Sequence, residues 1–137
     1  MSNSFTHLSI SSGYSFKYGS AHPEQLIQRA AQFNMTSLAL TDQNNLAGAI
    51  RFAQSCESFG IKPILGITLP FIQKSSKITL LAKSGSLSAL YRLVSGINTN
   101  TSDGVLTIEL LERFNQYSKD LIALLGPQSV LNKNYNA

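Results

Sequence analysis

Short polar side chains follow three apolar runs of the sequence, and they are the first candidates for chemistry. In the order of their runs, they are Ser9 and Ser11, then Asp42 and Gln43, then Thr68. If the three runs are parallel strands, their carboxyl ends meet at one edge of a sheet, where α/β proteins place their active sites. Such a group of side chains could hold a metal ion or supply a nucleophile.

The residue types limit this chemistry. Asp42 is the one carboxylate of the set, and a single carboxylate cannot hold a divalent ion in a hydrolytic site. Hydroxyl and amide groups are poor ligands for zinc or manganese. Neither Ser9 nor Ser11 stands in a nucleophile elbow or beside a base, so we reject a serine nucleophile. Because Asp42 immediately precedes a predicted helix, we interpret it as a helix N-cap and not as a catalytic group.

The two histidines and the cysteine are interpreted as structural. His7 is predicted to pack inside the fold, and His22, which precedes Pro23 at a predicted helix start, is predicted to be an exposed cap. Cys56 is the single cysteine and falls within an amphipathic pattern, which predicts a buried and inert thiol.

The aromatic residues and the distribution of cations indicate whether the chain contacts nucleic acid. Tyr14, Phe16 and Tyr18 could stack on bases, but we expect them to be buried. The net charge is +4, and the lysines and arginines are scattered along the sequence without forming a basic run. We therefore do not expect direct contact with nucleic acid.

Composition predicts one folded domain. The chain has 137 residues, of which 43% are apolar, which is enough for a core. Only 13% are charged, about half the usual fraction, so the surface is rich in uncharged polar residues or is partly covered. We find no signal-peptide pattern and no apolar window long enough for a membrane span, and we expect a cytoplasmic protein without membrane contact.

The apolar pattern predicts strands that alternate with helices. The predicted strands are 6–10, 37–40, 61–71, 78–82 and 121–125. The predicted helices begin at Pro23, near Leu46, near Leu87 and after Thr107, and Asn34 and Gly60 are predicted to end the first two. The face of the second helix that we expect to be buried carries Leu46, Ala49, Ile50, Ala53 and Cys56.

Strands of this kind predict an α/β fold with about five mostly parallel strands covered by helices. Periodicity does not separate an open doubly wound sheet from part of a barrel. No linker is visible before residue 128. We expect the domain to occupy residues 1–127 and residues 128–137 to form a frayed tail.

Several ordered motifs resemble one known family. His7–Ser15 is similar to the motif His-Leu-His-x-His-Ser-x-Tyr-Ser, and Leu38–Ala49 is similar to Leu-Ala-Leu-Thr-Asp-His-Gly-Asn-Leu-x-Gly-Ala. Gly60–Thr68 resembles Gly-Ile-Lys-Pro-Ile-x-Gly-x-Glu, and Tyr18–Glu24 is similar to an error-prone branch. These are motifs of the PHP domain at the N-terminus of bacterial C-family DNA polymerases, the DNA polymerase III alpha subunits.

The resemblance implies a fold and a chemistry. The family fold is a distorted barrel of seven β/α units, and this chain resembles its N-terminal half, so that residues 1–127 would be a partial PHP domain. Active members bind up to three ions of zinc, manganese or magnesium at the carboxyl ends of the strands and hydrolyse phosphoesters. The palm, fingers and thumb of the polymerases lie beyond the part that this chain resembles.

The family's metal-ligand positions are occupied by other residues in this sequence. Active members have histidine, aspartate or glutamate at most of these positions. The corresponding positions here are Ser9, Ser11, Tyr18, Asp42, Gln43 and Thr68. Only Asp42 retains a negative charge, so we expect a degenerate site with no catalytic, cofactor-binding or metal-binding residues and no bound cofactor.

Our functional prediction is a catalytically degenerate PHP module that is a structural or interaction part of DNA replication or repair synthesis. Its expected partners are the remainder of a C-family DNA polymerase or accessory replication proteins, and we do not expect activity from this chain alone. The alternative is a divergent metal-dependent phosphoesterase with a rearranged site. A decaying gene fragment without function is a third possibility.

Overall fold

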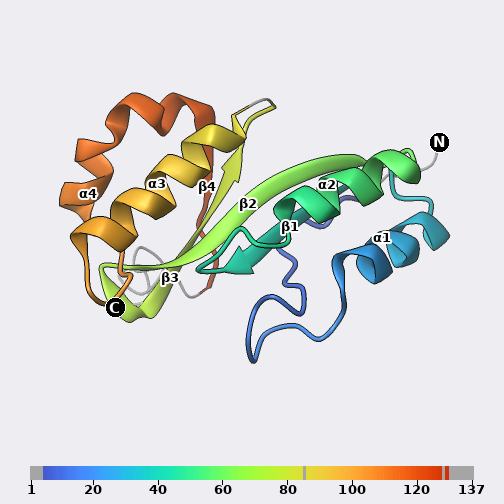
Figure 1. The fold of residues 1–137 in the computed structure, drawn as a ribbon, viewed down its shortest axis with the longest axis horizontal. Coiled ribbons are helices and arrows are strands. Elements are labelled where there is room, and N and C mark those ends of the chain that lie inside the picture. The colour runs from blue at the N-terminus through green and yellow to red at the C-terminus, as the bar shows by residue number, and fades with distance from the viewer. Residues whose placement is uncertain (1–4, 85, 128, 130–137) are drawn as a thin grey trace.

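The computed structural model describes residues 5–84, 86–127 and 129, which form a mixed sheet with helices packed against it (Figure 1). The strands are β1 (Ser37–Gln43), β2 (Lys62–Phe71), β3 (Gln73–Ala82) and β4 (Leu121–Leu124). The helices are α1 (Pro23–Gln32), α2 (Ala49–Ser58), α3 (Leu87–Asn100) and α4 (Ile108–Arg113), and a 3₁₀ helix, η1 (Asn115–Asp120), precedes β4.

The strand order is β1-β2-β3-β4; the β1–β2 pair is parallel and the β2–β3 and β3–β4 pairs are antiparallel, so that β3 alone runs against the other three strands. The prediction of mostly parallel strands therefore holds for three of the four described strands and fails for β3. The exception arises because β2 and β3 are joined through Ile72 alone, and so short a connection can only make an antiparallel hairpin. The strand predicted at 78–82 also begins earlier than expected, because β3 starts at Gln73.

The predicted first strand is also absent as a strand among the described residues. Residues 5–10 are extended beside β1 and make two backbone hydrogen bonds to it. The Ala39 N–H donates to the His7 carbonyl at 3.0 Å, and the Thr41 N–H donates to the Ile10 carbonyl at 2.8 Å. This segment therefore lies along the edge of the sheet without a full strand ladder, and the described sheet has four strands and not five.

The predicted helix ends are largely confirmed. Pro23 is the first residue of α1, and Asn34 and Gly60 lie in the left-handed region, with φ of 56° and 66°, after α1 and α2. Thr107 caps α4, because its Oγ1 accepts a hydrogen bond from the Leu110 N–H at 3.2 Å.

The helices pack on one face of the sheet and divide the core into two clusters. Helices α1 and α2 cover β1, and α3 covers β2 and β3 (Figure 1). Phe52 and Cys56 of α2 are fully buried. Ile50 is 53% exposed, so its predicted place on the buried face of α2 is wrong; Phe52 lies there instead. Burial raises the pKa of the Cys56 thiol to about 11, in agreement with the predicted inert thiol.

The opposite face of the sheet is open. Because side chains alternate along a strand, residues paired in register, such as Leu81 with Ile122, point to the same side. Ile64, Leu81, Ile122 and Leu124 line a pocket of about 710 Å³, which we call the amino-end pocket because it lies at the amino ends of β1 and β2. Ile122 is 47% exposed. An apolar sheet surface is thus left accessible in this part of the chain.

The predicted frayed tail, residues 128–137, lies outside the described residues except for Ser129. Ser129 is 2% exposed, and its N–H donates to the Gly126 carbonyl at 3.0 Å. Ser129 itself is therefore buried and not exposed as a frayed tail would be.

Candidate functional site

A second pocket, of about 350 Å³, lies at the carboxyl ends of β1 and β2, and we call it the carboxyl-end pocket. It brings together residues from segments far apart in the sequence. Its lining comprises Ser9, Tyr18, Gln43, Thr68, Lys77, Thr79, Leu124, Gly126, Pro127 and Ser129. Four of the six positions that the resemblance singled out, Ser9, Tyr18, Gln43 and Thr68, therefore line one pocket.

The register of three neighbouring strands places the polar groups of this pocket. Gln43 of β1 pairs with Thr68 of β2, which in turn pairs with Thr79 of β3. The Thr68 hydroxyl donates to the Thr41 carbonyl at 3.1 Å and lies 2.9 Å from the Thr79 hydroxyl. Since Thr68 has already used its one proton, the Thr79 hydroxyl is the donor in this second bond.

Sequence reasoning missed Lys77, Thr79 and Ser129. Lys77 and Thr79 lie at this end because β3 runs back along β2, and the antiparallel hairpin had not been predicted. Ser129 lies in the segment predicted to be frayed. The alternation of apolar residues in Ile78–Ala82 could have shown that Lys77 and Thr79 share a face, but not that this face meets Gln43.

Asp42 lies beside the pocket and is not a helix cap. Its side chain accepts three hydrogen bonds, from the Ser12 N–H at 2.6 Å, the Ser12 hydroxyl at 2.7 Å and the Ser15 hydroxyl at 2.6 Å. The N-cap of α2 is Gly48, six residues later. The predicted capping role is therefore wrong, and its failure has a physical reason: the donors that Asp42 satisfies come from a loop about thirty residues earlier in the chain.

We call Ser12, Ser15 and Asp42 the Asp42 cluster. All three residues are at most 2% exposed. Ser15 also accepts a hydrogen bond from the Gln43 N–H at 2.8 Å, which joins the loop to β1. Hydrogen bonds to an ionised carboxylate are about twice as strong as neutral ones, so this cluster fixes the loop that carries Ser11 and Tyr18.

Ser11, the last of the six singled-out positions, does not line the carboxyl-end pocket. It lies in the same loop, where the chain passes close to itself at Gly19. A Cβ at Gly19 would collide with the carbonyl oxygens of Ser11 and Ser12, so the loop closes only with glycine there.

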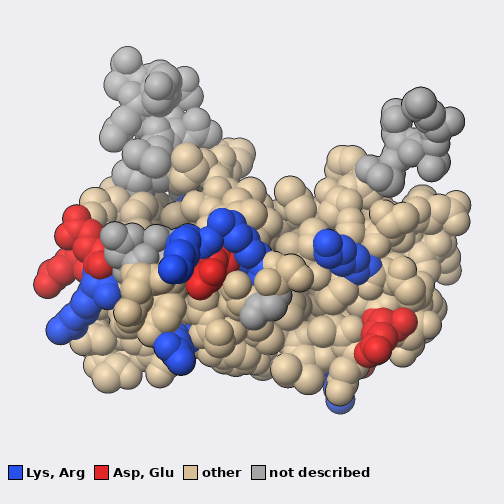
Figure 2. Space-filling view, turned by 90° about the horizontal axis from the view of Figure 1, so that it is seen from above, with Lys and Arg blue, Asp and Glu red and all other residues tan. Residues whose placement is uncertain are grey.

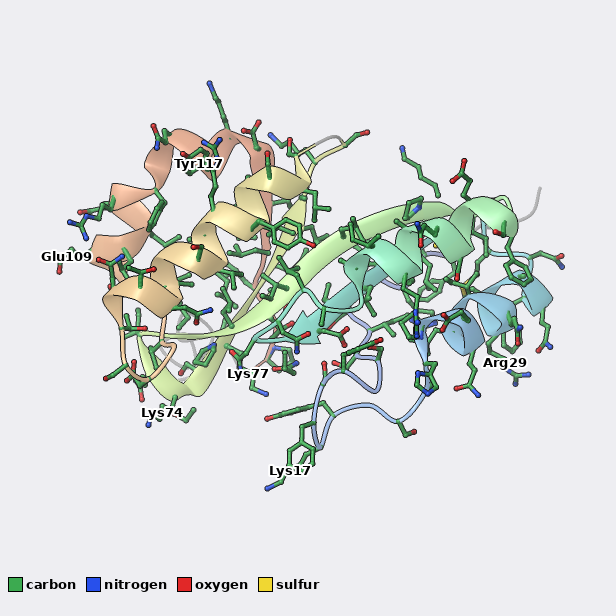
Figure 3. The ribbon with its side chains drawn as sticks, in the orientation of Figure 1. Lys17, Arg29, Lys74, Lys77, Glu109 and Tyr117 are labelled. Carbon is green, nitrogen blue, oxygen red and sulfur yellow. The ribbon has the colours of Figure 1, made fainter. Side chains whose placement is uncertain are left out.

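The aromatic residues of the loop are exposed and not buried as predicted. Phe16 is 84% exposed and Tyr18 is 58% exposed. The Lys77 ammonium lies 3.9 Å from the centroid of the Tyr18 ring, a cation–π contact between β3 and the loop. Figure 3 shows Lys77 on the side of β3 toward the loop and Lys17 at the outer end of the loop.

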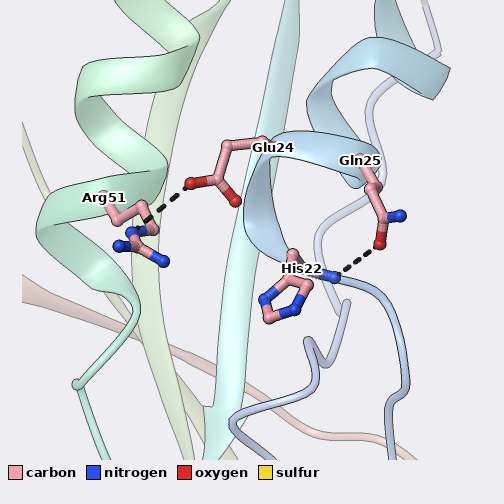
Figure 4. A network of polar contacts seen from close by, with 4 residues as sticks. All are labelled: His22, Glu24, Gln25 and Arg51. Carbon is pink, nitrogen blue, oxygen red and sulfur yellow. Dashed lines mark hydrogen bonds and ion pairs between the residues drawn. The ribbon is translucent and has the colours of Figure 1, made fainter.

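The histidines lie away from the pocket. His7 is exposed and stands edge-on to the Phe5 ring, with centroids 4.6 Å apart, so the prediction of a packed histidine is wrong. His22 is exposed at the start of α1, as predicted, and its N–H donates to the Gln25 side chain at 2.9 Å. Figure 4 shows this contact beside the ion pair that joins Glu24 of α1 to Arg51 of α2 at 3.4 Å.

The donor set of the carboxyl-end pocket does not fit a divalent metal ion. Its lining offers hydroxyls, an amide, a phenol and the cation of Lys77, whereas zinc, manganese and magnesium are held by carboxylates, imidazoles or thiolates. Over the described residues, no group of three histidine, cysteine, aspartate or glutamate side chains could hold a metal ion. On the face seen in Figure 2, charged residues are dispersed over a mostly uncharged surface.

The fold and this pocket define an α/β domain of one family. Residues 7–130 match the PHP domain, and the chain belongs to this family. DNA polymerase III subunit alpha of Buchnera aphidicola subsp. Acyrthosiphon pisum is 38% identical over 138 residues, or 94% of this chain. The same subunit of Bacillus subtilis is 34% identical over 88% of this chain, and the error-prone DNA polymerase of Symbiobacterium thermophilum is 43% identical over 58%.

These relatives are much longer than this chain. The chain spans 12% of the Buchnera subunit, 11% of the Bacillus subunit and 7% of the Symbiobacterium polymerase. The predicted resemblance to these polymerases is confirmed. Among solved structures, an amidohydrolase from Chromobacterium violaceum has a TM-score of 0.54 at 23% identity, covering 69% of this chain and 33% of that protein, which is a likeness of fold.

The described part of the chain contains no helix with the length and apolar character that a membrane crossing requires.

Proposed function

We propose that this chain is a catalytically inactive PHP module that serves as a structural part of a C-family DNA polymerase. The observation that carries the proposal is the lining of the carboxyl-end pocket, where family ligand positions hold Ser9, Gln43 and Thr68 and where Lys77 adds a positive charge. A cation in this place repels a metal ion, and neutral hydroxyls do not replace the ligands that a hydrolytic centre needs.

The structural role rests on the open face of the sheet. The amino-end pocket presents apolar side chains from three strands, including Ile64, Leu81 and Ile122. In a complete PHP barrel this face would be the interior, and further strands would cover it. We therefore propose that the remaining barrel strands of a C-family polymerase pack against this face, and that the module works in the cytoplasm with the DNA-synthesis machinery.

Measuring the metal bound by the chain tests whether the metal-dependent chemistry of the family has been lost. The purified chain is dialysed against zinc and manganese in turn, and bound metal is measured by mass spectrometry together with phosphoesterase activity. We expect less than one tenth of an equivalent of either metal and no activity above the buffer. Stoichiometric zinc or manganese would instead favour the alternative, a divergent phosphoesterase.

A reverse substitution supplies the matched control. The quadruple variant Ser9→His, Ser11→His, Gln43→His, Thr68→Glu restores the family residue types at four positions. If the pocket is the remnant of a metal centre, the variant should bind more zinc than the parent chain. Equal metal binding by the two proteins would argue that these positions do not form one site.

Co-purification tests the partner. The chain is co-expressed with the remainder of a C-family polymerase, and we expect the two to purify together. Ile122→Asp places a charge on the open face and should abolish the association. Ile50→Asp is the control, because Ile50 is similarly exposed but lies on α2, on the other side of the sheet. Loss of association in both variants would contradict a specific role for the open face.

A further inference from the structure

The charged residues on the open face of the sheet are all of one sign. The two pockets of this face meet at Leu124, which lines both of them. Their charged lining residues are Lys62 and Lys83 in the amino-end pocket and Lys77 in the carboxyl-end pocket. Among the described residues that line the two pockets, there is no aspartate or glutamate. A partner that covers this face therefore meets positive charge beside an apolar surface.

The direction of the strands brings two of these lysines to the same end of the amino-end pocket. Lys62 is the first residue of β2, and Lys83 directly follows Ala82, the last residue of β3. Because β2 and β3 are antiparallel, the beginning of one strand lies beside the end of the other. The amino-end pocket thus has a cationic end made by Lys62 and Lys83.

The floor of the same pocket is apolar. Leu81 of β3 pairs with Ile122 of β4, and Ile64 and Leu124 complete the floor. Ile122 is 47% exposed, so a partner that packs there removes apolar surface from water, which favours association. An apolar floor with a cationic end matches a segment that carries apolar side chains along its length and an anionic group at one end.

Neither Lys62 nor Lys83 has an anionic partner over the part of the chain that the structure describes. The ion pair found there joins Glu24 to Arg51, on the helices. The Lys83 ammonium donates a hydrogen bond to the Lys119 carbonyl, which is a neutral group. A charge that is buried in an interface without an opposite charge is costly. A partner that covers this end of the pocket must therefore supply carboxylates.

The same charges argue against a second copy of this chain as the partner. If two open faces packed together, each would bring lysines and no carboxylate from its described pocket linings. Lys62 and Lys83 lie in the pocket at one end of the face and Lys77 lies in the pocket at the other, so turning one copy does not remove the repulsion. Like charges that face each other suppress the wrong partner.

We propose that the amino-end pocket binds an acidic, amphipathic segment of a C-family DNA polymerase. The apolar side chains of this segment pack against Ile64, Leu81 and Ile122, and its carboxylates pair with Lys62 and Lys83. The inference rests on the proposed function, to which it adds the chemical character of the segment that covers the open face.

Zero-length cross-linking tests the pairing directly, because a carbodiimide joins an ammonium to a carboxylate only where the two are in contact. The chain is co-purified with the remainder of the polymerase and treated with carbodiimide, and mass spectrometry identifies the joined peptides. We expect Lys62 or Lys83 to be joined to an aspartate or glutamate of the partner. Lys74 is the internal control, because it is exposed on β3 but lines neither pocket, and it should not be joined to that segment.

Charge reversal measures what the pairing contributes to affinity. Lys62→Glu should raise the dissociation constant of the complex about tenfold, because a carboxylate then faces a carboxylate. Reversing Lys83 as well should raise it further. Raising the salt from about 0.05 M to about 0.5 M should weaken the parent complex more than the variant complex. Lys74→Glu is the matched control and should leave the dissociation constant unchanged. Lys62 is exposed, so its single variant tests the proposal even if the double variant does not fold.

Three results would overturn the inference. They are a complex that forms without a cross-link from Lys62 or Lys83, equal dissociation constants for Lys62→Glu and Lys74→Glu, and a dimer of the chain alone that Ile122→Asp dissociates in sedimentation. The first two can occur while Ile122→Asp still abolishes association with the polymerase remainder, which would leave the proposed function intact. If the chain and that remainder do not associate at all, both proposals fall.

Discussion

The Asp42 cluster and the carboxyl-end pocket are neighbours made of similar side chains, but they differ in whether their polar atoms have partners. In the cluster, the Asp42 carboxylate accepts three hydrogen bonds, and Ser15 both donates and accepts. In the pocket, the Ser129 hydroxyl has no partner among the described residues, and the Lys77 ammonium lies over the Tyr18 ring without an ion pair in the described part of the chain. The comparison teaches that a carboxylate from a functional motif can become structural, while neighbouring polar groups are left without hydrogen-bond partners in the described part of the chain.

The largest expected effect is in the cluster. Asp42→Ala removes the acceptor of three donors and leaves the buried Ser12 N–H and two hydroxyls unsatisfied, which should lower the free energy of unfolding by about 3 kcal/mol. Urea denaturation measures this change. Asp103→Ala is the control, because Asp103 is exposed and accepts one hydrogen bond, from the Val105 N–H. A loss below about 1 kcal/mol for Asp42→Ala would mean that the cluster does not hold the loop.

Gly19→Ala tests whether the loop must close tightly over the cluster. The added methyl group would meet the carbonyl oxygens of Ser11 and Ser12, and the required shift should cost about 2 kcal/mol. Gly126→Ala is a suitable comparison, because a Cβ there has no atom within 4 Å. Thermal unfolding of the two variants gives the difference, and equal melting temperatures would show that the loop is not closely packed.

Ser129→Ala should have a smaller effect, and of the opposite sign. Removing a buried hydroxyl that has no partner should stabilise the chain in the absence of ligand by about 0.5 kcal/mol. The same substitution in the cluster, Ser15→Ala, should destabilise, because Ser15 bonds Asp42 and Gln43. Urea denaturation compares the two variants. Destabilisation by Ser129→Ala would indicate a partner outside the described residues.

The smallest effect on stability is expected from Lys77→Gln. The substitution removes one cation–π contact with an exposed tyrosine and should change the free energy of unfolding by no more than about 0.5 kcal/mol. If Lys77→Gln unfolds as readily as Asp42→Ala, the two regions are one structural unit and the contrast between them is lost.

Local signals in the sequence predicted the helices well. Pro23, Asn34, Gly60 and Thr107 act through their own backbone or through a partner three residues away, so nearby sequence is enough to identify them. Four of the five predicted strands were located to within about five residues, but the reversed direction of β3 was not predicted. The hairpin at Ile72 has a non-glycine residue at φ 64° in place of a usual turn sequence, and without a turn signal the antiparallel pairing was missed.

The candidate site likewise has features that the sequence predicted and features that it did not. Motif spacing was sufficient to bring Ser9, Gln43 and Thr68 to one place, because a resemblance carries the arrangement of the strands with it. The roles of Asp42 and Lys77 could not be predicted from the sequence, because both depend on contacts between segments that only the folded chain brings together. Ser12 and Ser15 are ordinary serines in the sequence, and nothing local marks them as partners of a buried carboxylate.

The short connection between β2 and β3 also bears on how the chain reaches its fold. Contacts between residues close in sequence form sooner than contacts that must close a long loop, and isolated hairpins form within about 10 μs. We therefore expect β2 and β3 to pair first and to act as the template on which β1 adds to one side and β4 to the other. The loop held by Asp42 then docks after β1 is in place, late in folding.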